Sequence, residues 1–467
     1  MSRHHPPHAE RPPLPTPRML PLVGPLLAEL LLGMTMGLVG TILAARLGDA
    51  QGAAFALCSQ VLAMLFVFFR IVGAGVSVVV SQALGGNRPD EAERCARATL
   101  GASTWIGGIC TVLAVLGAEP MLRAMNAPAA VMPLAVPFLQ CIAPAALFDA
   151  WNTTLASVLR AHMRARATLV FNGVMQGSHL LLAIVLMSGF GSWHGWGLIG
   201  YAVALLISRA FGLGLLLWMW RTYLGLLPRW HDWWAWQRHT LAPVLHIGMP
   251  GAAENVAWRA GFMFSVAMVG QMGTAALATH AYTMQIIHLI MLFGLATGLS
   301  AEVVVGHMIG AGRLHQAHRL VRRALVRGLS VTVVVALAAA LSGPWLLGHF
   351  TQDATIIAAG ATLMWLNLAL ETGRTFNLLL VNVLRAAGDA RYPLVMGIAS
   401  FVLVLGGGSW FFGIHLGWGL AGVWVAYAAD EWLRGLISWH RWVTLGWVPT
   451  ARQMHRRLRQ SPAVHTP

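Results

Sequence analysis

The chain contains no lysine, and charged residues of every kind are scarce. Only 10% of its 467 residues are charged, whereas a soluble domain carries about 25%. This scarcity excludes an ordinary soluble protein. Cysteines are few as well, and Cys58, Cys95, Cys110 and Cys141 lack metal-ligand spacing, so they predict no zinc site. No HExxH, GxSxG or phosphate-binding glycine loop occurs, and we therefore expect no enzyme and no cofactor.

Long apolar runs take the place of charge, since 57% of the residues are hydrophobic. In hydrocarbon every backbone amide needs a partner within its own segment, so such runs must be helices. The alternation of polar and apolar residues that marks β-barrel strands is missing. We predict twelve membrane spans, at about residues 19–45, 52–80, 98–117, 131–156, 168–189, 195–220, 243–270, 276–306, 326–348, 355–382, 393–414 and 417–440.

The positive charge has a regular placement. All 31 basic residues are arginine, and 24 of them fall in the two tails and in alternate loops between the predicted spans. Cytoplasmic loops carry the excess of basic residues, so both tails are predicted to be cytoplasmic and the number of spans even. The net charge of +15 is thus explained by membrane topology, and we expect no nucleic acid partner.

An internal repeat relates the two halves of the chain. Residues 25–166 match residues 250–391 at a constant offset of 225, and after a three-residue slip residues 195–200 match residues 417–422. Six helices per half is an even number, so both halves enter the membrane in the same orientation. We predict an all-α integral membrane protein with twelve transmembrane helices, in two six-helix lobes related by a pseudo-twofold axis along the membrane normal.

These observations divide the chain into five parts, and two lobes in one chain suffice for a functional monomer. The connector between the lobes holds four tryptophans with basic flanks, which favours the headgroup region. The expected parts are a disordered cytoplasmic tail (1–18), an N-lobe (19–220), an amphipathic cytoplasmic linker (221–242), a C-lobe (243–440) and a basic cytoplasmic tail (441–467).

Charged groups within the predicted spans are candidates for function, because they are costly at bilayer depth. Glu29 and Glu254 occupy equivalent places, each four residues after a proline, Pro25 or Pro250, that is expected to kink its helix. Such a carboxylate can take up a proton or bind Na⁺. The alternative is that each pairs with an arginine of a neighbouring helix.

Further polar candidates lie in the second half. Glu371 and Arg374 are three residues apart on one helix face and can pair directly. Arg259 follows Glu254 by five residues and is expected to modulate its proton affinity. Gln60 and Gln285 are equivalent positions, which either line a cavity or form interhelical hydrogen bonds.

The last predicted span carries Asp430, Glu431 and Arg434 near its cytoplasmic end. We expect these groups to serve in gating or in structural pairing between the halves. His280 and His288 have a titration range suited to proton relay, although a histidine satisfied within the core is favoured for both.

Several segments resemble the multidrug and toxic compound extrusion (MATE) family. They are MGLVGTILAARLG, SQALGGNRPDEAER, IGMPGAAEN, VGHMIGAGRLHQA and LRAAGDARYP, in this order over nearly the whole chain. The resemblance implies that Glu254 and Glu371 match acidic positions important for ion coupling or substrate binding. Many bacterial members have aspartate where this chain has Gly40, so the resemblance favours coupling in the C-lobe.

Together these features predict a bacterial inner-membrane antiporter that exports amphipathic, cationic organic compounds in exchange for H⁺ or Na⁺ by alternating access. Its expected partners are the lipid bilayer and small organic substrates, and Glu254 is the place for Na⁺. A flippase for lipid-linked saccharides is the alternative within the same superfamily. Twelve rather than fourteen predicted helices argue against it.

Overall fold

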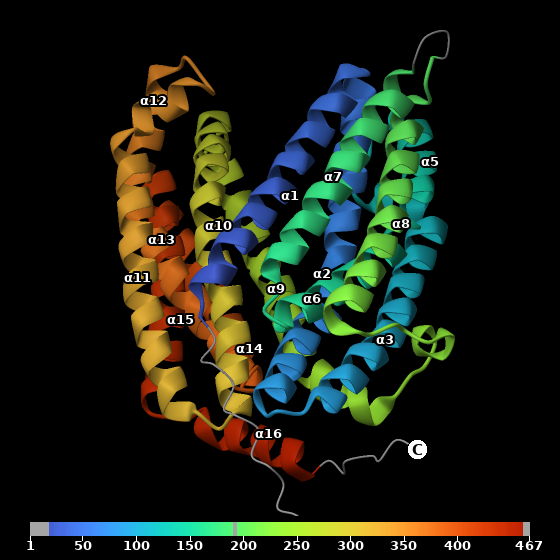
Figure 1. Cartoon of the computed structure of the whole chain (residues 1–467). Helices are drawn as coiled ribbons and strands as arrows, with labels where there is room; N and C mark the ends of the chain where they lie inside the picture. The colour runs from blue at the N-terminus through green and yellow to red at the C-terminus, as the bar shows by residue number, and fades with distance from the viewer. Residues whose placement is uncertain (1–17, 190–193, 461–467) are drawn as a thin grey trace, which may run out of the picture.

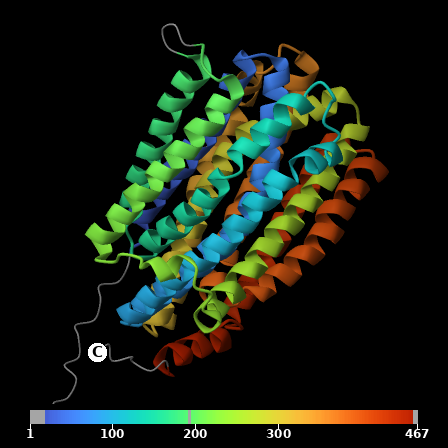
Figure 2. The same cartoon turned by 90° about the vertical axis from the view of Figure 1, so that its right-hand side faces the viewer.

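The computed structural model describes residues 18–189 and 194–460, and every regular element within these ranges is a helix. Apart from Arg18, the expected N-terminal tail lies outside the described residues. Two groups of long helices stand side by side and diverge from the end of the bundle where α16 lies, called here the α16 end (Figure 1). Viewed from the side, the helices run through the whole thickness of the bundle, with α16 beneath them (Figure 2).

The first lobe is built from the first half of the chain. Its α5 and α6 are bent by 43° at a short break and together form one span. The lobe contains α1 (Leu20–Arg46), α2 (Asp49–Gly85), α3 (Pro89–Leu116), α4 (Ala118–Ala124), α5 (Met132–Ile142), α6 (Ala145–Ala161), α7 (Ala165–Ser188) and α8 (Gly197–Leu224).

The second lobe repeats this arrangement. One of its spans changes from α-helix to π-helix along its length, in α14 (Arg391–Ser400), η2 (Phe401–Gly406) and η3 (Ser409–His415). The other helices are α9 (Arg238–Gln271), α10 (Thr274–Gly310), α11 (Leu314–Leu341), α12 (Gly343–Gly348), α13 (Ala354–Ala386) and α15 (Gly419–Val443).

The twelve predicted spans all correspond to helices. Among the described residues, nine helices are long and apolar enough to cross a membrane, and the bent pair of α5 and α6 makes a tenth. The remaining two, α9 and α15, carry several charged side chains and so have a lower hydropathy. The predicted fold class is confirmed, with twelve spans in two six-helix lobes.

The lobes meet on the pseudo-twofold axis through two equivalent hydrogen bonds. The Gln82 side chain of α2 donates to the carbonyl oxygen of Ala386 in the second lobe, at 2.6 Å. Its equivalent, His307 of α10, places Nε2 2.8 Å from the carbonyl oxygen of Ala161 in the first lobe. Donor and acceptor are each 225 residues apart, so the repeat seen in the sequence also forms the contact between lobes.

Small residues allow α2 and α10 to approach closely at this contact. Ser81 faces its equivalent Gly306, and one turn further on Gly85 and Gly310 stand against the opposite backbone. A Cβ atom on Gly85 would overlap the carbonyl group of His307, and one on Gly310 would overlap that of Gln82. Glycine is therefore required at both positions while the lobes are joined here.

Two segments at the α16 end differ from their expected form. The linker is shorter than predicted, because α8 continues to Leu224 and α9 starts at Arg238, leaving residues 225–237 with the short helix η1 (Trp230–Trp233). The expected basic tail is helical over α16 (Val448–Gln460). In Figure 1, α16 lies across the base of the bundle, beneath the long helices.

We predict that Gly310→Leu destabilises the joined arrangement of the lobes, because its side chain must displace the backbone of α2. Overpacking of this kind costs about 1–3 kcal/mol. Thermal unfolding of the purified protein in detergent should show a lower Tm. Gly214→Leu is the matched control, because no neighbouring atom lies within 4 Å of a Cβ built there. Equal Tm values for the two variants would contradict the expected role of this contact.

Candidate functional site

A cavity of about 600 Å³ lies between the two lobes. Its wall comes from α1, α2, α5, α6, α7 and α8 of the first lobe and from α9 and α10 of the second. Apolar side chains such as Leu62, Phe66 and Leu295 make up much of it, and polar groups are interspersed among them. The volume is typical of a small-molecule site. Its charged lining residues are Glu29, Arg70, Asp149, Arg160, Arg209, Arg259 and Glu302.

Two equivalent residues meet where α2 and α10 line the cavity. Ser77 of α2 donates a hydrogen bond to Glu302 of α10, and only 2% of Glu302 is exposed. One turn nearer the α16 end lie Ser81 and Gly306, so the contact between lobes begins directly below. Sequence reasoning missed Glu302. A single carboxylate in the apolar run of α10 was the signal that could have identified it.

The carboxylates that follow the prolines are both paired. Glu29 lies 2.9 Å from Arg160, and its equivalent Glu254 lies 2.6 Å from Arg385, the equivalent of Arg160. The alternative of pairing with a neighbouring arginine is thus the one that the structure shows. The Glu29 pair lines the cavity, whereas Glu254 is buried, lies close to Gly397 of α14 and is outside the lining. Glu302 feels the charges of both arginines.

A second pair of equivalent ion pairs has its charges exchanged. In the first lobe Asp149 of α6 lies 2.7 Å from Arg209 of α8. In the second lobe the same two places hold Arg374 of α13 and Glu431 of α15, 3.3 Å apart. Since an ion pair is preserved while its polarity is reversed, the requirement at these places is neutralisation of charge between the two helices.

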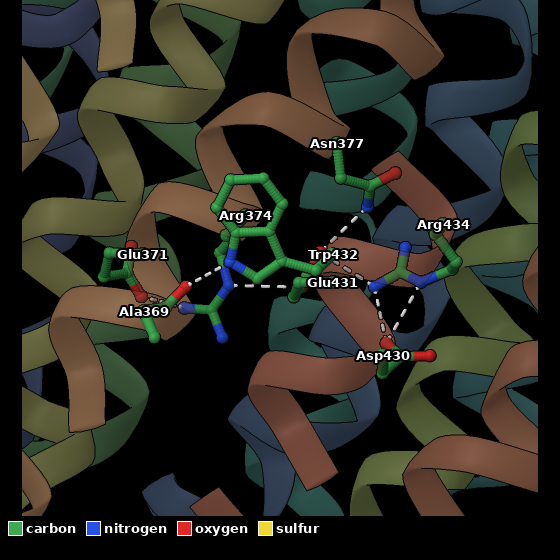
Figure 3. A network of polar contacts seen from close by, with 8 residues as sticks. All are labelled: Ala369, Glu371, Arg374, Asn377, Asp430, Glu431, Trp432 and Arg434. Atoms are coloured by element: carbon green, nitrogen blue, oxygen red, sulfur yellow. Dashed lines mark hydrogen bonds and ion pairs between the residues drawn. The ribbon is translucent and has the colours of Figure 1, made fainter. Parts of the chain in front are cut away.

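The charged groups of α13 and α15 form one buried network (Figure 3). The predicted pairing of Arg374 with Glu371 is present, at 2.5 Å. Arg434 contacts Asp430 at 2.7 Å and Glu431 at 2.9 Å, Asn377 donates to Glu431 at 2.8 Å, and Ser400 donates to Asp430 at 2.5 Å. All these partners belong to the second lobe. The expected pairing of Asp430, Glu431 and Arg434 between the lobes is therefore not seen, because α15 packs on α13 and α14 of its own lobe.

Two arginines of the cavity have no carboxylate partner. Among the described residues, no acidic oxygen lies within 4.0 Å of the guanidinium of Arg70 or Arg259. Arg70 is on α2 and Arg259 on α9, so they reach the cavity from different lobes. Arg70 feels the positive charges of Arg385 and Arg259 and the negative charge of Glu302. Their equivalent positions are Leu295 and Met34, so this feature breaks the pseudo-symmetry. An isolated arginine within apolar α2 was the signal that sequence reasoning overlooked at Arg70.

The remaining candidates are placed as follows. Gln60 and Gln285 are exposed on α2 and α10 and lie outside the lining of the cavity. Pro25 and Pro250 are inside the continuous helices α1 and α9. His280 is buried, with Nε2 3.3 Å from the hydroxyl group of Tyr427 in the second lobe, and it makes its described polar contact away from the cavity.

Comparison with known proteins identifies the family. The sequence model of the MatE family matches residues 25–185 and 250–408, which are the two repeats. The chain belongs to the MATE family. It is 30% identical to the uncharacterised transporter YisQ of Bacillus subtilis, over 91% of this chain and 94% of YisQ. The probable multidrug resistance protein NorM of Synechococcus is 27% identical, over 96% of this chain and 98% of that protein.

Solved structures of MATE transporters share the fold. The transporter VcmN of Vibrio cholerae superposes with a TM-score of 0.81 at 19% identity, over 94% of this chain and 98% of VcmN. A transporter of the MOP superfamily from Pyrococcus furiosus, described as having a binding pocket of reverse polarity, gives a TM-score of 0.79 at 16% identity, over 95% of this chain and 96% of that one. MATE proteins are transporters rather than enzymes, as expected from the sequence.

The glycine that departs from the usual MATE pattern lies against an aromatic cluster. A Cβ atom on Gly40 would come within 2.7 Å of the Tyr201 hydroxyl oxygen and 3.0 Å of Phe55. The Tyr201 ring packs edge-on against Phe55, with ring centroids 5.0 Å apart. Tyr201 therefore occupies the space into which an acidic side chain at position 40 would extend. This MATE protein lacks the carboxylate at position 40, and a side chain there would require the Tyr201 hydroxyl group to shift.

We predict that the ion pair of Asp149 and Arg209 can be reversed without loss of the fold. Asp149→Arg alone places two cations side by side and should cost about 1–3 kcal/mol, because the pair is partly exposed to the cavity. Combining it with Arg209→Glu recreates the polarity of the second lobe and should restore most of the stability. Tm values of the single and double variants measure the coupling. A double variant no more stable than Asp149→Arg would show that polarity at this place is specified by the first lobe.

Proposed function

We propose that the chain is a secondary active antiporter that exports amphipathic organic compounds in exchange for H⁺ or Na⁺ by alternating access. The lobes at residues 19–220 and 243–440 move relative to each other about the cavity. The observation that carries the proposal is the cavity between two equivalent lobes, with the lobes joined on one side by the contact of α2 with α10. The reciprocal bonds of Gln82 and His307 must break when the α16 end opens.

The orientation in the membrane follows from charge. The arginine-rich loops at residues 86–97 and 311–327 lie at the α16 end, together with both described ends of the chain. We place this end in the cytoplasm of a bacterial cell with the protein in the inner membrane, because cytoplasmic loops carry the excess of arginine. In this orientation the contact between the lobes closes the cavity toward the cytoplasm, and cargo would leave the cavity toward the outside.

Ion coupling is assigned to Glu254 in the second lobe. The absence of an acid at Gly40 supports this assignment, and so does the deep burial of Glu254, which is 7% exposed. A proton or Na⁺ that neutralises Glu254 competes with Arg385 for the carboxylate. The positive charge of Arg385 is then no longer balanced by Glu254. Arg385 acts electrostatically on Glu302, so the change reaches the cavity and the axis between lobes. The coupling requires that the ion bind the two lobe arrangements with different affinities.

The buried network of Glu371, Arg374 and Glu431 has a supporting role in this proposal. Each carboxylate is neutralised by an arginine within the second lobe, which holds α13 and α15 together. Arg385 is part of α13, so this rigid packing keeps it beside Glu254. Movement of α13 as a unit then carries the effect of the ion to the contact between lobes.

We expect Glu254→Gln to abolish gradient-driven transport while Glu29→Gln retains it. The two carboxylates are equivalent and similarly paired, so the second variant is a matched control for loss of one negative charge. The measurement is dye uptake into inverted vesicles under a proton gradient and, separately, a Na⁺ gradient. The effective gradient names the ion. Full transport by Glu254→Gln would overturn coupling at this residue, and its loss in both variants would place coupling in both lobes.

The cargo is proposed to carry an acidic group rather than only a basic one. The expected preference for cations rested on the buried acids, with Arg259 and Arg374 as the reason that an anion was equally conceivable. Glu29 and Asp149 are each paired with arginine. Four arginines and three acids line the cavity, and the two unpaired cations face it from opposite lobes. A carboxylate, sulfonate or phosphate between Arg70 and Arg259 would relieve their repulsion and link the lobes. The MOP superfamily transporter with reversed pocket polarity offers a parallel for such selectivity.

We predict that purified protein binds fluorescein, an anion, more tightly than rhodamine 6G, a cation with the same xanthene core. Loss of a hydrogen bond between charged groups costs about 1.5–3 kcal/mol, so Arg70→Gln and Arg259→Gln should each weaken fluorescein binding roughly tenfold or more. Fluorescence polarisation in detergent measures both dyes. Arg123→Gln is the control, because Arg123 is exposed and paired with Glu119 away from the cavity.

The flippase alternative is not favoured. The described residues form twelve spans, and the additional pair of helices that would support that activity is not among them. The cavity of about 600 Å³ also suits a single small molecule better than a lipid-linked oligosaccharide.

A further inference from the structure

A second pocket, of about 680 Å³, lies on the outer side of the second lobe near the α16 end. Four arginines of α11 line it, and Phe376 of α13 and Trp439 of α15 are among its apolar wall. Figure 1 shows α11 at the outer edge of this lobe, away from the cavity between the lobes. The pocket therefore belongs to a different surface from the transport site. The four arginines are Arg319, Arg322, Arg323 and Arg327.

The positive charge of this pocket is not neutralised by the protein. All four guanidinium groups belong to exposed residues, and among the described residues none has an acidic oxygen within 4.0 Å. The first turn of α11 contains no acid, whereas that of the equivalent helix α3 contains Asp90 and Glu91. A further acid of α3, Glu93, pairs with Arg97, but its equivalent in α11 is His318. The pocket therefore has an excess of charge that the first lobe lacks.

The equivalent place in the first lobe is filled by the connector between the lobes. Arg97 and Trp151 are the equivalents of Arg322 and Phe376. Asp232 of η1 lies 3.3 Å from Arg97, and the ring of Trp233 packs edge-on against Trp151 with centroids 5.0 Å apart. One acidic group and one large apolar group thus cover the arginine and the aromatic ring there.

In the second lobe, no described segment of the chain covers the equivalent place in this way. At Gly101 of α3 the connector backbone approaches so closely that a Cβ atom would overlap the carbonyl oxygen of Ala235. The equivalent residue in α11 is Val326, which is exposed and lines the pocket. The segment that follows α15 forms α16 instead, which contacts α10. The described residues thus leave the pocket open. Its arginines and apolar side chains suit a ligand that has both an acidic group and an apolar part.

We propose that this pocket binds an anionic phospholipid of the surrounding membrane. Its phosphate takes the place of Asp232 against Arg322 and the neighbouring arginines. Its acyl chains take the place of Trp233 against Phe376 and of Ala235 against Val326. Arginine is well suited to phosphate because it donates two parallel hydrogen bonds. The depth also fits, because the last arginine, Arg327, is followed directly by the apolar part of α11. Basic pockets between transmembrane helices commonly bind anionic headgroups.

The test is native mass spectrometry of the whole purified protein with added dioleoyl phosphatidylglycerol or dioleoyl phosphatidylcholine. The anionic lipid should bind preferentially, and Arg322→Gln should weaken it roughly fivefold, the effect of one basic residue near an anionic membrane surface. Arg94→Gln is the matched control, since Arg94 is exposed on α3 and equivalent to Arg319. Its binding should equal that of the unchanged protein. Arg322→Lys keeps the charge but loses the pair of parallel hydrogen bonds, so its affinity should lie between those of the unchanged protein and Arg322→Gln.

Competition identifies the source of the phosphate. If the acyl chains contribute, millimolar inorganic phosphate or glycerol phosphate should leave phosphatidylglycerol bound. Displacement by either soluble anion would overturn the lipid assignment. Equal binding of both lipids, or equal weakening by Arg94→Gln and Arg322→Gln, would overturn the site itself. Matching Tm values for the two variants establish that a loss of lipid is not a loss of fold.

Discussion

A charged side chain at bilayer depth must be neutralised within the protein, and much of this structure follows from that constraint. Glu29 is held by Arg160 and Glu254 by Arg385, on helices far apart in the chain. The constraint is clearest where the first lobe pairs Asp149 with Arg209. The equivalent positions of the second lobe hold Arg374 and Glu431, so the ion pair is kept while the two charges are exchanged. Arg70 and Arg259 form no ion pair among the described residues. Both line the cavity, where an anionic ligand can neutralise them.

Pseudo-symmetry explains both the movement and its limits. Equivalent residues meet on the axis, where Gln82 and His307 each bond to a carbonyl oxygen of the opposite lobe. Ser77 and Glu302 differ more strongly, because they place a hydroxyl and a carboxylate at equivalent positions in direct contact. In the proposed mechanism, such a difference allows one lobe to respond to an ion while the other supplies the surface for cargo. The symmetric contact is then the part that opens and closes, and the asymmetric residues carry the specificity.

The same comparison between lobes extends to the membrane surface. The connector over α3 and the open pocket on α11 start from equivalent helices and diverge through a few replacements, among them Gly101 by Val326 and Glu93 by His318. The connector that passes from the first lobe to the second covers α3 of the first lobe. The second lobe is then left with a basic groove, which the bilayer itself is able to fill.

The sequence by itself determined the fold class, the twelve spans and the repeat, because hydrophobic length, arginine placement and a constant offset are properties of the chain read in order. It also led to Glu29 and Glu254, since charges in apolar runs are visible without a structure. The partners of these charges were decided only in three dimensions. Arg160 and Arg385 were expected in loops. In the structure they lie in the last turns of α6 and α13, from which they contact the carboxylates. The same holds for Arg70, Arg259 and Glu302, which lie on separate helices and become one site only when the lobes pack. Asp430, Glu431 and Arg434 were expected between lobes, yet the direction in which α15 turns its charged face places them inside one. Helix packing sets that direction, and a periodicity read along one helix carries no information on which neighbour it will face.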